Sequence, residues 1–214
     1  MKIIKFDKNA IKFKESLKNI FNTDILENVH LLHTKDNSRS LFDKYNDNTT
    51  EYHKIFNINK HLFEEDYEKI IKYIKDTEYK DEDFIIYQTF PALRVSIPGN
   101  LSVGEMHIDA DYNHPKEEMN YWMPLTELND INTVWHETEP NKGDFHPLII
   151  NYGEIAEVNF NQCRHFSKVN TTNKTRLSLD FRIIPGSKWD KVDTNNESMF
   201  HNVKFVIGKY YKKM

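Results

Sequence analysis

The chain has 214 residues and a mass of 25.6 kDa, which suits one large domain or a core with attached helices. Its net charge of −4 is spread along the sequence without a basic stripe, so we expect no nucleic-acid partner. A mean hydropathy of −0.73 and the lack of a long apolar run argue against a membrane-spanning helix. Cys163 is the single cysteine, which excludes an internal disulfide and a multi-cysteine zinc site. Because residues 1–7 carry no signal-peptide pattern, we expect a cytoplasmic protein.

The first part of the chain, residues 1–83, has the pattern of a helical support. Residues 9–21 place Ile11, Leu17, Ile20 and Phe21 near one helical face, and residues 62–77 carry a stripe of Leu62, Tyr67, Ile70, Ile71 and Ile74. Between them, residues 34–52 are rich in Asp, Asn, Ser and Thr, which predicts a long loop. We expect the second helix to pack against the rest of the protein as a support. A role at a membrane surface is disfavoured, because the polar face of this helix mixes both charge signs.

From residue 84 onward the sequence pattern changes: short runs rich in β-forming residues alternate with turn residues. The predicted strands are 84–90, 92–97, 105–109, 120–125, 133–137, 148–151, 154–160, 164–169 and 176–184. So many short strands without intervening helices indicate a sandwich, a barrel or a jelly roll over residues 84–185. Residues 186–214 form a C-terminal extension, in which 204–211 is either a last strand or a helical turn. With no repeat and no clear linker, we predict a single domain over 1–214.

Arginine is scarce in this lysine-rich chain, and its positions are therefore informative. The five arginines are Arg39, Arg94, Arg164, Arg176 and Arg182. In a chain this rich in lysine, we expect lysine wherever only a positive charge is needed. A position occupied by arginine therefore indicates a need for the planar guanidinium group, which can form two parallel hydrogen bonds. Four of the five lie between residues 94 and 182, and we look for the chemistry there.

The first candidate is the triplet His107-Ile108-Asp109, whose outer two side chains share one face if the segment is a strand. Alone, such a triplet is typical of a solvent-facing strand edge. With His165 at the start of a later strand, however, two imidazoles and one carboxylate make up the facial donor set of non-haem Fe(II) sites. Cys163, two residues before His165, is interpreted as a small packing residue.

The second candidate is Arg176 with Ser178. Residues 176–183 alternate strictly, with Arg176, Ser178, Asp180 and Arg182 on one face and Leu177, Leu179, Phe181 and Ile183 on the other. A solvated edge strand would give the same pattern. A guanidinium group beside a hydroxyl can also bind a carboxylate through several hydrogen bonds. A dicarboxylate bound in this way could chelate, through its other end, a metal held by the preceding strands.

In this order and spacing, His107-x-Asp109, His165 and Arg176-x-Ser178 resemble the Fe(II)/2-oxoglutarate-dependent dioxygenases. The resemblance covers about residues 85–185. It implies a mainly β fold with flanking helices, namely a double-stranded β-helix, also called a cupin-like jelly roll. It also implies that His107, Asp109 and His165 bind Fe(II), that Arg176 and Ser178 bind the distal carboxylate of 2-oxoglutarate, and that O2 is a second cosubstrate.

A narrower resemblance is to the streptomycin-biosynthesis-type branch, near the phytanoyl-CoA hydroxylase-like enzymes. The segments that carry it are Tyr87-Gln88, Leu93-Arg94, 111–115, 120–126 and 170–182. This branch implies small, sugar-like or natural-product substrates, and it makes Asn120 an additional contact for 2-oxoglutarate. The chain departs from the phytanoyl-CoA enzymes where Cys163-Arg164, and not a Gly-Ser pair, precedes His165, which weakens any claim to their substrates.

Four further residues are candidates for substrate contact. Arg94 either orients a polar substrate or pairs with a nearby acid. Asp111, Tyr112 and His114 follow the metal-binding triplet in a loop that should border the open metal positions, where loops carry specificity.

We therefore expect an enzyme that oxidises, most simply by hydroxylation, a C–H bond of a polar small molecule such as a sugar, a nucleotide-sugar or a natural-product intermediate. Desaturation, ring formation and alcohol oxidation differ from hydroxylation only in how the substrate is placed. Two alternatives stay open: a hydroxylase of a peptide or protein side chain, and a non-enzymatic jelly-roll protein that binds a small ligand. The sequence does not choose the substrate or the oligomeric state.

Overall fold

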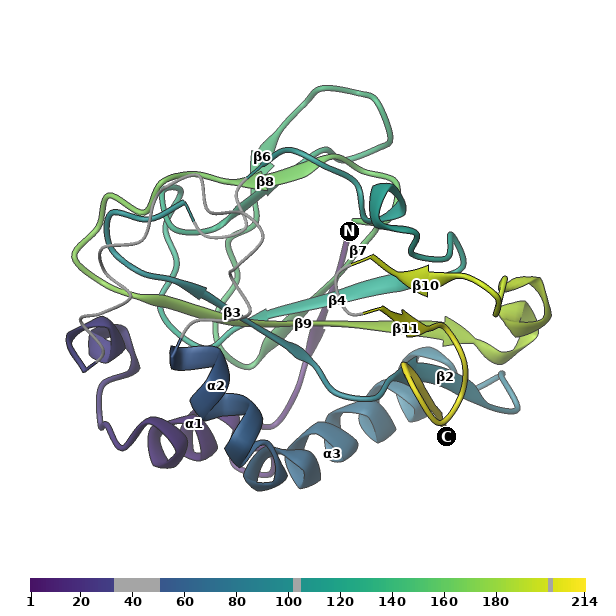
Figure 1. Cartoon of the computed structure of the whole chain (residues 1–214), viewed down its shortest axis with the longest axis horizontal. Coiled ribbons are helices and arrows are strands. Elements are labelled where there is room, and N and C mark those ends of the chain that lie inside the picture. The colour runs from purple at the N-terminus through teal and green to yellow at the C-terminus, as the bar shows by residue number, and fades with distance from the viewer. Residues whose placement is uncertain (33–50, 102–104, 200–201) are drawn as a thin grey trace.

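The computed structural model describes residues 1–32, 51–101, 105–199 and 202–214, and its elements form three layers (Figure 1). Helices cover one face of a large sheet, and a small sheet lies over the other face. The loop predicted over 34–52 lies outside the described residues except for Glu51 and Tyr52, which belong to a helix. Among the described residues, no helix is both long and apolar enough to cross a bilayer.

The helices agree with the predicted N-terminal support. They are α1 (Phe13–Phe21), α2 (Glu51–Asn59) and α3 (His61–Glu78), with short 3-10 segments at Leu26–Leu31, Asp109–Tyr112 and Gly186–Lys191. Helix α3 confirms the helix predicted over 62–77. Helix α1 begins four residues later than predicted, because the Asp7 carbonyl accepts from the Ala10 and Ile11 amides and closes a turn there. The helix ends at Asn22, whose left-handed φ of 50° stops it.

The strands form antiparallel sheets, as a jelly roll requires. They are β1 (Lys2–Lys5), β2 (Ile85–Gln88), β3 (Ala92–Ser96), β4 (Met119–Pro124), β5 (Val134–His136), β6 (His146–Pro147), β7 (Glu154–Val158), β8 (His165–Ser167), β9 (Arg176–Pro185), β10 (Glu197–Ser198), β11 (Val203–Lys204) and β12 (Tyr211–Lys213). The large sheet has the order β1-β7-β4-β9-β2-β12, with β3 also paired to β9, and the small sheet has the order β6-β5-β8. Strands β10 and β11 pair with each other.

Four segments differ from the strand predictions. Residues 105–109 form no regular strand; His107 makes an isolated bridge to His165, and Asp109 starts a 3-10 turn. Residues 148–151 bury Leu148 and Ile150 and are not a regular strand; the Leu148 amide donates to the Val134 carbonyl of β5 at 2.8 Å, and the small-sheet strand lies just before them at β6. Strands β1 and β12 are short and consist largely of lysines, with a single buried side chain each. Their sequences therefore lack the alternation of apolar and polar residues that predicts a strand. The ambiguous tail resolves into β11, a turn and β12.

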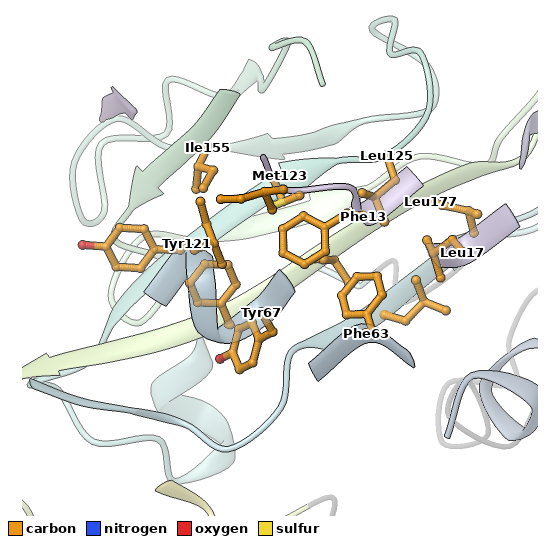
Figure 2. Close-up of a cluster of buried hydrophobic side chains, with 14 of the residues drawn as sticks. Phe13, Leu17, Phe63, Tyr67, Tyr121, Met123, Leu125, Ile155 and Leu177 are labelled. Carbon is orange, nitrogen blue, oxygen red and sulfur yellow. The ribbon is translucent and has the colours of Figure 1, made fainter. Parts of the chain in front are cut away.

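Between the helices and the large sheet lies the main hydrophobic core, part of which is drawn in Figure 2. Helix α3 contributes Phe63 and Tyr67, and the sheet contributes residues such as Tyr121 and Leu177. The predicted α3 stripe is confirmed with one correction: Leu62 is 49% exposed, and Phe63 next to it is fully buried. Leu62 lies in the first turn of α3 on the side that faces solvent, whereas Phe63 lies on the side that faces the sheet.

Strand β9 is buried on both faces. Its apolar side chains Leu177, Leu179, Phe181 and Ile183 belong to the helix-side core. The alternate residues Arg176, Ser178, Asp180 and Arg182 therefore point the other way, toward the small sheet, and all four are also buried. The interpretation of this face as a solvated strand edge is thus wrong.

Phe63→Ala should destabilise the protein by about 3–5 kcal/mol, because the Phe63 ring packs against Phe13, Phe56 and Phe90 at centroid distances of 4.7, 5.5 and 6.2 Å. The matched control is Leu62→Ala, one residue away on the exposed side of α3, which should cost less than about 1 kcal/mol. Urea unfolding followed by circular dichroism measures both free energies. Equal losses would contradict the placement of the core.

Glu137 fastens the end of β5 to the start of β8. Its buried carboxylate accepts from the Gly143 amide at 2.8 Å, from the Arg164 amide at 2.8 Å and from Arg164 Nε at 3.0 Å. The hydrogen bonds from the Arg164 side chain outweigh the effect of burial and lower the pKa of Glu137 to about 2. A carboxyl group in an unfolded chain has a pKa near ~4.3, so the folded state holds this proton less strongly.

Glu137→Gln should therefore cost roughly 2 kcal/mol at pH 7, the value of hydrogen bonds to a charged group. Because the folded pKa is the lower one, the stabilisation by wild-type Glu137 is complete above the unfolded pKa and disappears as the pH falls toward 2. The difference in the free energy of unfolding between wild type and variant, measured with urea, should thus become smaller below about pH 4.5. Glu139→Gln, at a neighbouring exposed acid, serves as the control; a gap independent of pH would show that Glu137 is not ionised in the folded protein.

Candidate functional site

The site lies between the two sheets, where the polar face of β9 meets the first residue of β8. His107 and His165 are held side by side by two backbone hydrogen bonds, from the His107 amide to the His165 carbonyl at 3.1 Å and back at 3.0 Å. Their ring centroids are 4.3 Å apart. The structure therefore brings together two histidines that lie far apart in the sequence.

Asp109 completes a group of three possible metal ligands. The donor atoms of His107, Asp109 and His165 all lie within 4.8 Å of one another. Asp109 Oδ1 is 3.9 Å from His107 Nε2 and 3.6 Å from His165 Nε2. Although residues 105–109 are not a regular strand, His107 and Asp109 face the same point, as the predicted triplet requires.

The atoms that face away from this point have other partners. His107 Nδ1 lies 2.7 Å from the Glu105 carbonyl and His165 Nδ1 lies 3.2 Å from the Cys163 carbonyl. A carbonyl only accepts, so each Nδ1 carries the proton and each Nε2 presents its lone pair. Phe160 stacks on the His165 ring at 4.3 Å and 21° and fixes its plane.

The second oxygen of Asp109 is held by two polar side chains. Asp109 Oδ2 accepts from Asn120 Nδ2 at 2.7 Å and from Arg182 Nη2 and Nε at 2.7 and 3.2 Å, which leaves Oδ1 to face the histidines. Burial alone would raise the pKa of Asp109, but the charges of Arg182 and of nearby groups hold this pKa well below its ordinary value. Burial lowers the pKa of His165 to about 4, against the opposing effect of Asp109.

At neutral pH Asp109 is thus a carboxylate and His165 a neutral imidazole, which are the forms that bind metals. Two imidazole nitrogens and a single carboxylate oxygen, with their remaining polar atoms already engaged, fit Fe(II) in the facial arrangement. The fit rests on the donor set and on the partners that orient it.

Arg182 is a site residue that the sequence interpretation did not assign. Besides Asp109 it contacts Gln88 Oε1 at 3.1 Å, Glu118 Oε2 at 3.6 Å and Asp180 Oδ2 at 3.4 Å. The signal that could have found it is the alternation in β9, which puts Arg182 on the same face as Arg176, together with the scarcity of arginine.

Arg176 and Ser178 come together as predicted. Arg176 is almost fully buried, and it donates to Ser178 Oγ at 2.7 Å and to the Asn132 carbonyl at 3.0 Å. The same cavity reaches both Arg176 and the two histidines. Its lining residues are Arg94, His107, Trp122, Val134, Phe160, His165, Phe166, Ser167, Arg176 and Asp180.

The remaining predicted residues are divided between the cavity and its surroundings. Arg94 lines the cavity and pairs with Asp180 at 2.9 Å, so its pairing with a nearby acid is confirmed, and its contact with a substrate stays a prediction. Tyr112 packs its ring 5.1 Å from that of His107. Asp111 Oδ2 accepts from the Ile108 amide at 3.2 Å and shapes the turn after the triplet.

Two predicted residues lie elsewhere than expected. His114 Nδ1 is 2.8 Å from Glu118 Oε2, and its ring packs on Phe205 and Tyr210 of the C-terminal extension, so His114 is not a lining residue of the cavity. Asn120, expected to contact 2-oxoglutarate, directs its amide to Asp109 and is also not a lining residue.

One curated protein is similar to most of the chain. No protein-family model matches the chain. Over 165 residues, or 77% of each chain, it is 30% identical to the streptomycin biosynthesis protein StrG of Streptomyces griseus.

Solved structures overlap only in part. A nickel complex of the non-heme monooxygenase ThoJ overlaps with 48% of this chain and 45% of its own, at 16% identity and a TM-score of 0.39. The non-heme alpha-ketoglutarate-dependent carbocyclase SnoK from nogalamycin biosynthesis overlaps with 61% of this chain and 63% of its own, at 9% identity and a TM-score of 0.43. Each overlap thus spans less than two thirds of the solved protein.

The similarity to StrG extends over most of both chains, and the site holds the two histidines, the carboxylate and the buried arginine that the family resemblance requires. The chain therefore belongs to the family of the streptomycin biosynthesis protein StrG.

Proposed function

We propose that the enzyme hydroxylates a C–H bond of a polar small molecule in natural-product biosynthesis. The observation that carries this proposal is the shared cavity, because the metal-binding histidines and the buried Arg176 line one space. The name of StrG, a streptomycin biosynthesis protein, supports the biosynthetic context. The aromatic side chains Trp122, Phe160 and Phe166 also line that space and suit a small organic substrate shielded from water.

In this proposal His107, Asp109 and His165 bind the iron through Nε2, Oδ1 and Nε2. When bound, the iron supplies the oxidising chemistry together with 2-oxoglutarate and O2. Arg182 and Asn120 are positioning residues, since they hold Asp109 Oδ2 and so leave a single carboxylate oxygen for the metal. Asn120 thereby takes a role other than direct contact with 2-oxoglutarate.

Arg176 and Ser178 bind the distal carboxylate of 2-oxoglutarate. The contact from Arg176 to Ser178 Oγ and the contact from its Nε to the Asn132 carbonyl fix the guanidinium plane before the cosubstrate arrives. The buried Arg176 guanidinium attracts an anion that enters the cavity strongly, because few water molecules compete with the anion for its N–H groups. The chain of 2-oxoglutarate then extends toward the metal ligands.

The test of the reaction is incubation of the iron-loaded protein with 2-oxoglutarate, O2 and pools of hydroxylated small molecules, with succinate and product mass followed by mass spectrometry. A product heavier by one oxygen, formed with one succinate per turnover, supports hydroxylation. A mass loss of two hydrogens indicates desaturation, ring formation or alcohol oxidation. Turnover with peptides only would favour the alternative of a peptide or protein hydroxylase.

Asp109→Ala and His165→Ala should each weaken Fe(II) binding by at least tenfold to a hundredfold, since an open three-ligand site has no spare donor. Anaerobic calorimetric titration with Fe(II) measures the affinity. The control is His146→Ala, an exposed histidine on the neighbouring strand β6, which should bind iron as the wild type does. If both ligand variants keep wild-type affinity, the metal assignment is wrong.

Arg176→Ala should weaken 2-oxoglutarate binding on the order of a hundredfold or more, the usual loss when one partner of a buried charged pair is removed. Arg176→Lys should recover part of this affinity, because it keeps the charge without the fork. The measurement is a titration of 2-oxoglutarate into the anaerobic Fe(II) protein, followed by the charge-transfer absorption. Lys174→Ala, which removes an exposed charge two residues away, is the control; an unchanged Arg176→Ala protein would place the carboxylate clamp elsewhere.

A further inference from the structure

The cavity contains an ion pair for which neither iron nor 2-oxoglutarate accounts. Arg94 of β3 donates through Nη2 to Asp180 Oδ2 of β9 at 2.9 Å, and both residues line the cavity beside the two histidines. In the sheet, Arg94 lies opposite Ser178, and Asp180 lies opposite Trp122. The ion pair is therefore next to Ser178 on one side and to the aromatic lining residue Trp122 on the other.

One oxygen of this pair has no partner. Asp180 is 5% exposed, and within the described part of the chain its Oδ1 is a buried atom without a hydrogen bond, while Oδ2 takes both Arg94 and Arg182. An ionised carboxylate only accepts, so Oδ1 needs a donor from outside the described protein atoms. The terminal torsion of an aspartate is soft, so a small rotation turns this oxygen toward a ligand.

Arg94 offers the complementary group. Its side chain is 25% exposed, and among the described residues its one side-chain hydrogen bond is the one to Asp180. The guanidinium carries five N–H donors in a fixed plane, so it can donate to a ligand while the ion pair stays intact. After the rotation of Asp180, the pair would present one acceptor and one donor to the cavity.

Charge decides which ligand fits. Arg94 and Asp180 neutralise each other, and Arg182 next to them already faces Asp109 and Glu118. A phosphate here would face the Asp180 carboxylate and an ammonium would face the Arg94 guanidinium, and each arrangement costs like-charge repulsion. A neutral group that both donates and accepts meets no such cost, and two adjacent hydroxyls are the simplest example.

We propose that Arg94 and Asp180 form the subsite for the oxidised substrate and that they bind a neutral vicinal diol. One hydroxyl donates to Asp180 Oδ1, and the neighbouring oxygen accepts from Arg94. The ring or chain that carries the diol packs on Trp122 and Phe166, which line the same cavity. This inference rests on the proposed function and narrows its substrate class to neutral polyhydroxylated compounds, with no phosphate at this end.

The test uses saturation-transfer NMR on the full chain loaded with Zn(II), which is redox-silent, and 2-oxoglutarate. The probes are cis-1,2-cyclohexanediol, its dimethyl ether, which accepts but cannot donate, and cis-1,2-cyclohexanedicarboxylate, which is anionic. We expect the diol to bind about tenfold or more tightly than the other two, because each lacks the donor that the buried carboxylate needs.

Two variants should remove this preference. Arg94→Gln and Asp180→Asn should each weaken diol binding about tenfold, whereas Asp130→Asn, at an exposed acid outside the cavity lining, should leave it unchanged. Because Asp180 also contacts Arg182, the Arg94 variant decides the question if the Asp180 variant does not fold. Equal binding of the diol and its ether, no diol binding, or diol binding that ignores Arg94→Gln would overturn the proposal and mean that Oδ1 holds a buried water only.

The same samples separate this proposal from the oxygenase function. Calorimetric titration of 2-oxoglutarate into the Zn(II) protein reports the cosubstrate site independently of any diol. Tight 2-oxoglutarate binding without diol preference overturns the diol subsite and leaves the oxygenase function in place. Absence of 2-oxoglutarate binding in the wild type would instead overturn the proposed function.

Discussion

The contact between Arg182 and Asp109 is the interaction on which the rest of the site depends. Asp109 is buried, and a carboxylate taken out of water is costly unless it is paired and hydrogen-bonded. Arg182 supplies both the charge and two donors, and it can do so because β9 is a central strand with neighbours on each side. The helices that bury the opposite face of β9 thus also help to fix the position of Asp109, the proposed metal ligand.

Buried charges in this protein form a connected series. Arg94 contacts Asp180, Asp180 contacts Arg182, and Arg182 contacts Asp109 and Glu118. Each charge in the series has an opposite neighbour, so the low-polarity interior tolerates all of them. Glu118 in turn is close to His114 and accepts from Tyr211, which connects the C-terminal extension to the segment that follows Asp109.

The sequence predicts the pieces that follow from local patterns. The period of α3, the alternation in β9 and the His107-x-Asp109 spacing each depend on a few adjacent residues, and the structure agrees with them. The partners of Asp109 come from β4 and β9, and no local pattern indicates which polar residue meets a given carboxylate. The packing of His114 cannot be predicted for the same reason, since its contacts Phe205 and Tyr210 lie about ninety residues further along the chain. Strand β1 was missed because only Ile4 of its four residues is buried.

The two outer strands of the large sheet have a consequence for how the protein behaves in concentrated solution. An exposed strand edge is a template for pairing with another chain, and lysines along such an edge oppose that pairing. Strand β1 carries Lys2 and Lys5, and strand β12 at the other end carries Lys212 and Lys213. The lysines that make both strands difficult to predict from the sequence therefore also oppose edge-to-edge aggregation of the sheet.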